Sequence, residues 1–335
     1  MPIISFVIPV YKVGKYIENS MKSVCAQTFR DFEVVLVDNN TPDNSIEIAE
    51  QVLQKGGVNY RVIKQPVQGL PAARNIGIRE AKGDWIISID PDDTVSSRFL
   101  SDLYECATVN DLDIVFSKYA EVGPEDLFDF PEENFENVTE FYNREEVLQQ
   151  LLVRRLPLMI SNMFFNKAAF LEKDCWFDED VILGADLINL WRILLNTDRI
   201  AFINKYLYNH FCRPDSLMTA PSQKKIDSNI AGYNRLRCYI SQIMGDKMAG
   251  WVYSRAIFAF LAPLCVFGSL DLYNGYIAKY YSKEVHSLLQ TFPDKKIRVL
   301  NQLLAISPHL FYVINKVFRS PRSMIWRMIA AKIYK

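Results

Sequence analysis

The N-terminal third of the chain alternates short apolar runs with longer segments of helical period. The runs are rich in Val and Ile, as expected for strands of a parallel sheet that is covered on both faces. Strands are expected over residues 3–11, 32–38, 60–65, 84–90 and 112–119. Helices are expected over residues 14–27, 41–57, 69–83 and 96–110. This alternation predicts an α/β fold with a mostly parallel, twisted sheet and right-handed crossovers.

The pattern changes after residue 120. Residues 121–146 are acidic and rich in Phe without a clean period. We interpret them as a solvated loop with apolar anchors, and a lid or acceptor-facing insertion stays open as an alternative. From residue 229 onward the pattern is helical. The longest apolar run, residues 256–270, is short for a transmembrane helix.

Composition narrows the class of protein. The chain has 335 residues, 50% of them hydrophobic, and a net charge of −1. Such a chain forms one large domain or two ordinary ones, and its charge gives no indication of nucleic acid binding. Its six cysteines form no CxxC pair, which favours reduced thiols in the cytosol over a cysteine metal site. The N-terminus lacks the pattern of a signal peptide.

The stretch IISIDPDDTV places three carboxylates at the end of a predicted strand. Asp90, Asp92 and Asp93 would repel one another unless a cation or water compensates them. Ligands of such sheets gather at the carboxyl ends of strands, where Asp38 also stands. Mg²⁺ and Mn²⁺ take oxygen ligands, so this Asp-x-Asp motif predicts a divalent cation site. The alternative is a solvated turn in which Asp92 and Asp93 cap the next helix.

Three stretches in this order and spacing carry a more specific signal. They are IPVYKVGKYIENSMKSVCAQTFRDFEVVLVDNNTPDNS, GLPAARNIGI and AKGDWIISIDPDD. Together they resemble the family 2 glycosyltransferases of the GT-A fold, closely over residues 3–118 and weakly to about residue 218. The resemblance implies a GT-A domain over 1–220, with a nucleotide half over about 1–118 and an acceptor half over about 119–220. Residues 221–335 then form a mainly helical C-terminal region.

The resemblance implies how the chain binds a nucleotide-sugar donor. The first strand ends in Pro9, Val10 and Tyr11, whose backbone and ring would hold the base. Asp38, at the end of the second strand, would accept a hydrogen bond from a base N–H, which favours uracil. The guanidinium of Arg74 would approach the diphosphate.

One departure from the family lies after the second strand. The family commonly reads Asp-Asp-Gly-Ser there, and this chain reads Asp38-Asn39-Asn40-Thr41. Asn39 keeps an acceptor for the ribose but loses the charge. Asn40 replaces a glycine and is expected to adopt a positive φ, which Asn tolerates.

The resemblance also assigns the cation and the catalytic base. Asp92, helped by Asp90 or Asp93, would hold Mn²⁺ or Mg²⁺ on the donor diphosphate, and Asp90 would also contact the donor. The base that deprotonates the acceptor hydroxyl would be Asp186, near the start of a helix. The family commonly reads Gly-Glu-Asp here, so Ala185 takes the place of Glu. Glu179 or Asp180 stays open as the base.

The segment YLYNHFCRPDSLM resembles the part of the family that closes over the diphosphate. His210 would serve there as a hydrogen-bond donor or metal ligand, and Arg213 as a phosphate contact. His210 in a purely structural role is the alternative.

The C-terminal residues 316–335 combine basic and apolar side chains without an acid. This pattern suits an anionic membrane surface, and a helix docked on the body is the alternative. A polyprenyl-diphosphate-linked acceptor at the inner membrane would explain such an end.

The sequence therefore predicts a metal-dependent, inverting hexosyltransferase. It would move a sugar from a nucleotide sugar, UDP-sugar first, to a glycan or lipid-linked acceptor in surface polysaccharide synthesis. Its expected place is the cytoplasm, with a peripheral position on the inner face of the membrane as a variant. Two alternatives stay open. Ala185 and Asn39 keep a non-catalytic binding or scaffold subunit in view. A sugar-1-phosphate nucleotidylyltransferase would need a glycine-rich phosphate loop, and the first loop has only Gly14.

Overall fold

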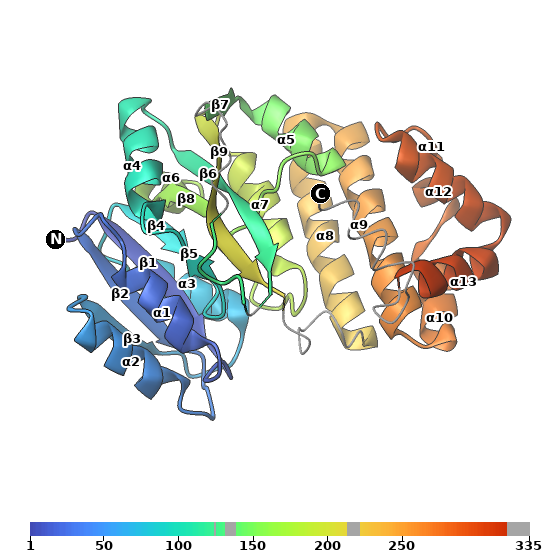
Figure 1. The fold of residues 1–335 in the computed structure, drawn as a ribbon. Coiled ribbons are helices and arrows are strands. Elements are labelled where there is room, and N and C mark those ends of the chain that lie inside the picture. Colours follow the sequence, from blue (N-terminus) through green and yellow to red (C-terminus); the bar gives the residue numbers. More distant parts are fainter. Residues whose placement is uncertain (124, 131–138, 213–221, 320–335) are drawn as a thin grey trace. The chain divides into compact units, whose positions relative to one another are not determined.

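The computed structural model describes residues 1–123, 125–130, 139–212 and 222–319. It divides into two compact units, Met1–Arg213 and Pro214–Lys335 (Figure 1). The division falls close to the boundary expected near residue 220. Two predicted features, Arg213 and the basic segment after residue 319, lie outside the described residues.

The N-terminal unit holds the predicted alternation of strands and helices. Its strands are β1 (Ile4–Val10), β2 (Phe32–Asp38), β3 (Tyr60–Lys64), β4 (Trp85–Ser88), β5 (Thr94–Val95), β6 (Ile114–Val122), β7 (Thr139–Tyr142), β8 (Met163–Asn166) and β9 (Ile200–Phe211). Its helices are α1 (Ile17–Cys25), α2 (Ser45–Lys55), α3 (Leu70–Glu80), α4 (Phe99–Val109), α5 (Arg144–Val153), α6 (Lys167–Glu172) and α7 (Ala185–Leu194).

All described strands belong to one sheet in the order β3-β2-β1-β4-β8-β6-β9-β5, with β7 paired to β9. The first four strands of this order are parallel, as the sequence predicts. The second half is mixed, because β8 runs antiparallel between β4 and β6 while β6 and β9 are parallel. The strand expected over residues 112–119 exists as β6, but β8 separates it from β4.

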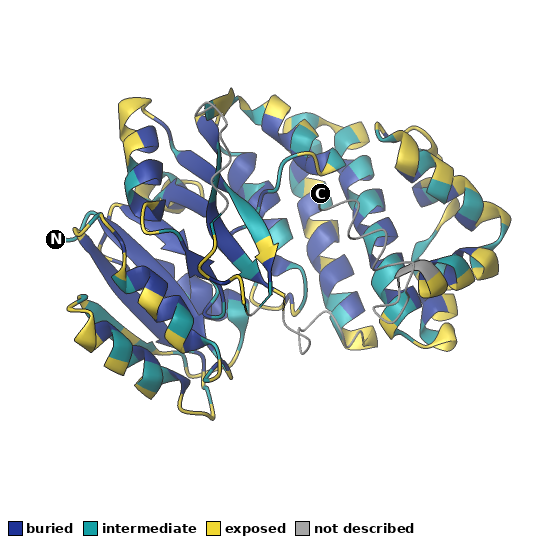
Figure 2. Cartoon of the chain, in the orientation of Figure 1, coloured by how far each residue is buried: buried dark blue, intermediate teal, exposed yellow. Residues whose placement is uncertain are grey.

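Helices cover both faces of the parallel half, which explains its continuous apolar strands. One face packs Ile8 and Leu36 against Met21 of α1 and Leu53 of α2 in a single buried cluster. On the other face α3 approaches closely because it carries Gly77. A Cβ at this position would lie 2.4 Å from a methyl group of Val7 and 3.0 Å from one of Val37. Figure 2 shows β1 and β2 dark blue, which is buried, and the outer side of α2 yellow, which is exposed.

The C-terminal unit is helical throughout its described part, as expected. Its helices are α8 (Gln223–Met244), α9 (Asp246–Phe267), α10 (Leu270–Tyr280), α11 (Lys283–Gln290), α12 (Lys295–Ile306) and α13 (Pro308–Arg319). Most of the apolar run expected to be too short for a membrane, residues 256–267, belongs to α9, whose 22 residues are long and apolar enough to cross one. More than half of its apolar window is buried, because α9 packs against α8, α10, α11 and α13. We therefore interpret α9 as the central helix of this unit.

Candidate active site

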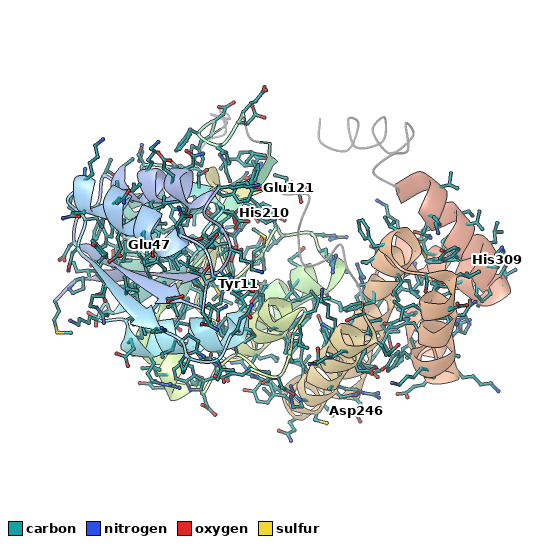
Figure 3. All side chains as sticks on the ribbon, turned by 90° about the horizontal axis from the view of Figure 1, so that it is seen from below. Tyr11, Glu47, Glu121, His210, Asp246 and His309 are labelled. Carbon is teal, nitrogen blue, oxygen red and sulfur yellow. The ribbon has the colours of Figure 1, made fainter. Side chains whose placement is uncertain are left out.

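The carboxyl ends of β1, β2 and β4 meet at one edge of the sheet. Val10 ends β1 and is in register with Asp38, which ends β2. Asp90 follows the last residue of β4 by two positions. Pro9 and Val10 are buried, whereas Tyr11 is half-buried. Figure 3 labels Tyr11 together with His210 of β9. The residues predicted to bind the nucleotide therefore lie at the same edge of the sheet as the Asp-x-Asp motif.

The loop after β1 is fastened to the loop after β2 by three successive backbone N–H groups. They donate from Lys12 to Thr41 Oγ1 at 2.9 Å, from Val13 to Ser45 Oγ at 3.0 Å and from Gly14 to Asp43 Oδ2 at 3.1 Å. Hydrogen bonds from Ser45, Thr41 and Gly14 lower the pKa of Asp43 although burial acts against them. The expected base-binding loop is therefore preorganised by its neighbour.

Hydrogen bonds from backbone N–H groups fix the side chains of Asp38 and Asn39. Asp38 Oδ1 accepts a hydrogen bond from the backbone N–H of Thr41 at 2.9 Å. Asn39 is buried, and its Oδ1 accepts from the backbone N–H of Gly69 at 2.8 Å, just before α3. Asn40 has a φ of 58°, which confirms the conformation predicted for it. Asn39 therefore has a structural role in addition to the ribose contact predicted for it.

Arg74 joins two of the predicted site residues. Its Nη2 donates to Asp90 Oδ1 at 2.7 Å, and its Nη1 donates to Asp186 Oδ1. The side chain of Arg74 is only 1% exposed, while those of Asp90 and Asp186 are 28% and 41% exposed. The ring of Phe177 lies 5.7 Å from the centre of the guanidinium. Arg74 is thus neither a solvent-exposed helix residue nor free to bind a diphosphate with these two nitrogens.

The electrostatics of this group depend on burial and charge together. Burial alone would lower the pKa of Arg74, but Asp186 and Asp90 raise it, so the arginine stays charged. Burial raises the pKa of Asp90; Arg74 opposes this, and the charges of Asp92 and Asp186 add to it. Asp90 consequently gains from any further positive charge placed beside it.

Asp186 lies in the first turn of α7, where the helix dipole favours a negative charge. Gly184 before it has a φ of 79°, a left-handed conformation that suits glycine. The alternative base Glu179 instead accepts a hydrogen bond from Asn75 at 3.0 Å. Asn75 also exchanges two hydrogen bonds with the backbone of Phe177, so its role is to hold the fold. Glu179 and Asp180 are both exposed, and Asp186 stays the predicted base.

Asp93 is buried away from the other two aspartates of the motif. Its Oδ1 accepts from the backbone N–H of Phe211 at 2.8 Å, and its Oδ2 contacts Tyr208 Oη and His210 Nδ1. Both oxygens are occupied by β9, so the geometry does not favour the metal role predicted for Asp93. It also does not cap a helix, since α4 begins only at Phe99. The motif divides into two carboxylates at the edge and one in the core.

His210 is held by Asp93 at 3.1 Å. This hydrogen bond raises the pKa of His210 to about 9, although burial acts against it. The raised pKa favours the protonated imidazole, in which both ring nitrogens are donors. Of the two roles predicted for His210, the geometry favours the hydrogen-bond donor.

The remaining carboxylates suit a hard divalent cation. Asp92 is half-buried, and its charge acts on Asp90. Among the described residues no group of three or more His, Cys, Asp and Glu is arranged to hold a metal. Mg²⁺ typically takes only one or two protein carboxylates and completes its shell with water and substrate phosphates. Asp92 and Asp90 fit a cation that arrives with a diphosphate.

Three residues of the site were not predicted. Tyr208 is fully buried, donates to Asp93 and accepts from the backbone N–H of Asp90 at 3.5 Å. Thr94 and Asn209 bind the backbone of the acidic segment, with Asn209 Nδ2 donating to the carbonyls of Leu127 at 3.2 Å and Asp129 at 2.9 Å. Thr94 follows the Asp-x-Asp motif directly and Tyr208 and Asn209 precede His210, but a strand pattern does not show which of these side chains face the site. Residues 125–130 therefore lie against β5 and β9, as a loop with anchors would.

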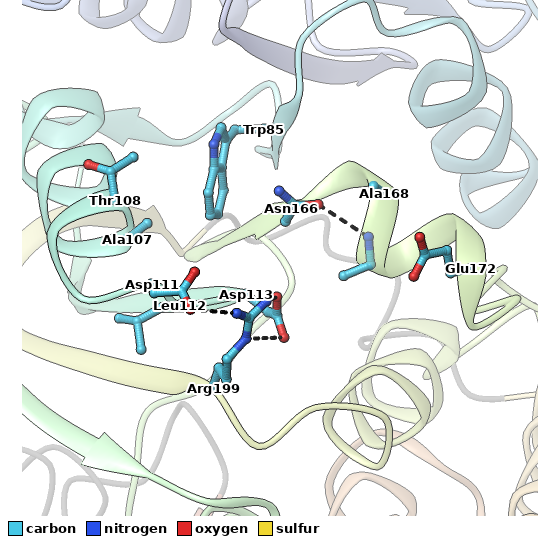
Figure 4. A pocket seen from close by; sticks show the side chains of 11 residues that line it. Trp85, Ala107, Thr108, Asp111, Leu112, Asp113, Asn166, Ala168, Glu172 and Arg199 are labelled. Atoms are coloured by element: carbon cyan, nitrogen blue, oxygen red, sulfur yellow. Dashed lines mark hydrogen bonds and ion pairs between the residues drawn. The ribbon is translucent and has the colours of Figure 1, made fainter.

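A pocket of about 430 Å³ lies at the opposite end of the strands (Figure 4). Its lining includes Trp85 at the start of β4, Asn166 at the end of β8, and Arg199, which pairs with Asp111 and Asp113. None of the predicted site residues lines it. It is separate from the acidic edge described above.

Sequence comparison adds a family to this geometry. Residues 5–181 match the profile described as Glycosyl transferase family 2, which is more than half of the chain. The uncharacterized glycosyltransferase EpsJ of Bacillus subtilis is 31% identical over 70% of this chain and 70% of its own length. Glycosyltransferase GlyG of Streptococcus pneumoniae is 30% identical over 64% of this chain and 73% of its own length.

Solved structures are similar over nearly the whole chain. The crystal structure of Staphylococcus aureus TarS 1–349 in complex with UDP-GlcNAc covers 94% of this chain and 90% of its own, with a TM-score of 0.67 and 18% identity. The mannosyltransferase PcManGT from Pyrobaculum calidifontis, in complex with GDP-Man and Mn²⁺, covers 92% and 88% with a TM-score of 0.53 and 16% identity. At these identities the likeness supports the fold, a GT-A-like mixed α/β sheet with a helical C-terminal region.

Proposed function

The chain belongs to glycosyltransferase family 2 and is a sugar transferase, and we propose that its donor is a nucleoside diphosphate sugar, with a UDP-sugar as the first choice. The acceptor is a hydroxyl of a glycan or a lipid-linked glycan, and the anomeric centre is inverted. The observation that carries this proposal is the bridge from Asp90 through Arg74 to Asp186. It connects the edge where the donor diphosphate would bind with the carboxylate that would remove the proton from the acceptor hydroxyl.

The nucleotide lies against the two fastened loops after β1 and β2. Asp38 accepts a hydrogen bond from a base N–H, and Tyr11 supplies a ring against which a base can stack. Asn39 is close to the ribose. The TarS structures with UDP-GlcNAc and with UDP support uridine, whereas PcManGT with GDP-Man keeps guanosine as the second choice.

Asp92 and Asp90 would hold Mn²⁺ or Mg²⁺ together with the donor phosphates. When bound, such an ion neutralises the charge that develops on the leaving diphosphate. The Mn²⁺ in PcManGT supports this choice. His210, charged at neutral pH, donates a hydrogen bond to the same anionic group. Arg213, outside the described residues, remains a predicted phosphate contact.

Asp186 takes the proton of the acceptor hydroxyl. The acceptor oxygen then forms its bond to the anomeric carbon from the face opposite the diphosphate, and the bond from that carbon to the phosphate oxygen breaks. The electron pair of the broken bond leaves with the nucleoside diphosphate. Arg74 fixes the direction of the Asp186 carboxylate, since it is itself immobilised by burial.

The acceptor belongs to a surface glycan in this proposal. TarS and TarP of Staphylococcus aureus are named for poly(ribitol-phosphate), and a relative from Borreliella burgdorferi, 27% identical, is named a cholesterol galactosyltransferase. A polymer and a lipid acceptor are thus both found among relatives. A polyprenyl-diphosphate-linked acceptor at the cytoplasmic face of the inner membrane combines the two.

A panel of UDP- and GDP-sugars with Mn²⁺ or Mg²⁺ tests the proposal by measuring release of the free nucleotide. We expect release from one UDP-sugar, its loss on addition of EDTA, and its loss in Asp92→Asn. The matched control is Asp198→Asn, an aspartate that pairs with Arg144 and is remote from the edge. Donor binding without any turnover would instead favour a scaffold subunit. Formation of a nucleotide sugar from a sugar 1-phosphate would favour a nucleotidylyltransferase.

A further inference from the structure

Five large apolar side chains are exposed along the last two described helices. We call this set the α12–α13 face: it consists of Val299, Ile306, Leu310, Val313 and Val317. Ile306 is 83% exposed, and the three residues of α13 are between 40% and 49% exposed. Single exposed apolar residues need no explanation, but a row of them does.

The exposed residues of α13 follow helical spacing. Leu310, Val313 and Val317 are separated by three and four positions, so they lie on one side of the helix. The other side of α13 is already used, because Phe311 is buried and its ring lies 5.8 Å from that of Phe258 in α9. The C-terminal unit therefore covers one side of α13 and leaves the apolar other side to solvent. Figure 2 shows exposed, yellow segments along α12 and the start of α13.

The charge of this part of the chain has a single sign. Asp294, the N-cap of α12, is the last acid, and no Asp or Glu follows it to residue 335. Lys295, Lys296 and Lys316 are exposed on the two helices. The basic residues from here to the end are Lys295, Lys296, Arg298, Lys316, Arg319, Arg322, Arg327, Lys332 and Lys335.

The charge distinguishes between three candidate partners of the α12–α13 face: the tail after residue 319, a second copy of the chain and a lipid surface. The tail after residue 319 is itself basic, and so is the same face of a second copy, so both would bring like charges together. An anionic lipid surface offers the opposite charge and an apolar interior at once. We propose that the α12–α13 face docks on an anionic lipid bilayer, with its apolar side chains in the interface and its lysines at the headgroups. This inference does not depend on the sugar-transfer proposal.

Co-sedimentation of the full chain with vesicles tests the docking. One set of vesicles is phosphatidylcholine alone, and the other contains phosphatidylglycerol as well. We expect binding to the second set that weakens with salt, and a loss of about tenfold or more in the double variant Val313→Asp, Val317→Asp. The control is Val67→Asp, Val109→Asp, two exposed valines of the N-terminal unit that change the net charge equally. Circular dichroism and nucleotide release check that both variants are folded.

Four results would overturn the proposal. The first is equal weakening by the two double variants. The second is loss of binding on deletion of residues 320–335 together with unchanged binding of the face variant, which would assign the membrane contact to the tail alone. The third is a change from dimer to monomer in the face variant without a change in vesicle binding. The fourth is absence of binding by the unaltered chain.

Discussion

Arg74 and Asp186 form an ion pair although 112 positions separate them in the chain. The arginine is a buried residue of α3 and the aspartate lies in the first turn of α7, so the pair links these two helices. Because Arg74 also binds Asp90, it couples the predicted donor site to the predicted base. A buried guanidinium with two carboxylates is rigid and always charged, which suits a positioning residue.

Replacement of Arg74 tests this coupling. Arg74→Met leaves two carboxylates without their partner, so we expect kcat to fall about 10²-fold through misplacement of Asp186. The free energy of unfolding should fall near the lower end of about 3–5 kcal/mol, because both carboxylates are partly solvated. Arg74→Lys keeps the positive charge but cannot donate to both carboxylates from a planar guanidinium, so its kcat should lie between those of Arg74→Met and the unaltered enzyme. Arg144→Met, which removes an exposed pair with Asp198, should cost about 0–1 kcal/mol. Unchanged kcat in Arg74→Met would contradict the positioning role.

Asp92 and Asp93 are adjacent but should respond differently to the same substitution. Asp92→Asn should weaken Mn²⁺ binding, measured by titration with UDP present, and leave the thermal midpoint unchanged. Asp93→Asn should leave Mn²⁺ binding nearly unchanged and destabilise the fold by about 1–3 kcal/mol, because β9 loses a charged acceptor. Strong loss of Mn²⁺ affinity in a folded Asp93→Asn variant would restore Asp93 as a metal ligand.

Asp38 tests the nucleotide assignment. A base contact is shared by ground and transition states, so Asp38→Ala should raise the donor KM about tenfold and leave kcat nearly unchanged. Asp38→Asn keeps an acceptor for the backbone N–H of Thr41, so it preserves the loop conformation and removes only the charge offered to the base. If Asp38→Asn behaves as the unaltered enzyme, the carboxylate does not read the base.

Glu33 should make stability depend on pH. Burial would raise its pKa, but hydrogen bonds from Arg61, the backbone N–H of Lys82 and Ser5 together lower it below the ordinary value of 4.5. A carboxyl whose pKa is lower in the folded state stabilises the fold above that ordinary value, and the contribution disappears as pH falls through the folded pKa. Urea unfolding should therefore separate Glu33→Gln from the unaltered chain by about 1–3 kcal/mol at pH 7 and by less at pH 3. A constant difference across this range would exclude the linkage.

The parallel half of the fold could be predicted because long apolar runs and helical periods coincide there. Residues 32–38 form β2 with the bounds that the sequence suggests. α2, however, begins at Ser45 and not at residue 41, because Asp43 holds residues 41–45 in a turn through side-chain contacts. β8 has only four residues, too few for a period to show. Its antiparallel place next to β4 depends on tertiary contacts alone.

The site was partly predictable for a related reason. Asp90, Asp92, Asp38 and Arg74 stand in motifs or at strand ends, so their type and place indicated chemistry. The sequence does not show in which direction a side chain points. In the structure Asp93 faces the core, and Arg74 faces two carboxylates. The role of Tyr208 depends on β9 crossing beside the motif, a contact over 115 positions.

The most direct test of the account is the rate of sugar transfer by Asp186→Asn, measured together with calorimetric donor binding in Mn²⁺. A general base acts on the acceptor, so kcat should fall by about 10² to 10⁴ while the donor Kd stays within about twofold. Glu179→Gln and Asp180→Asn serve as matched variants and should retain most of kcat. A mild effect of Asp186→Asn with a severe effect of either of these would transfer the base to that residue. Collapse of donor binding along with turnover in Asp186→Asn would contradict the mechanism at its central step.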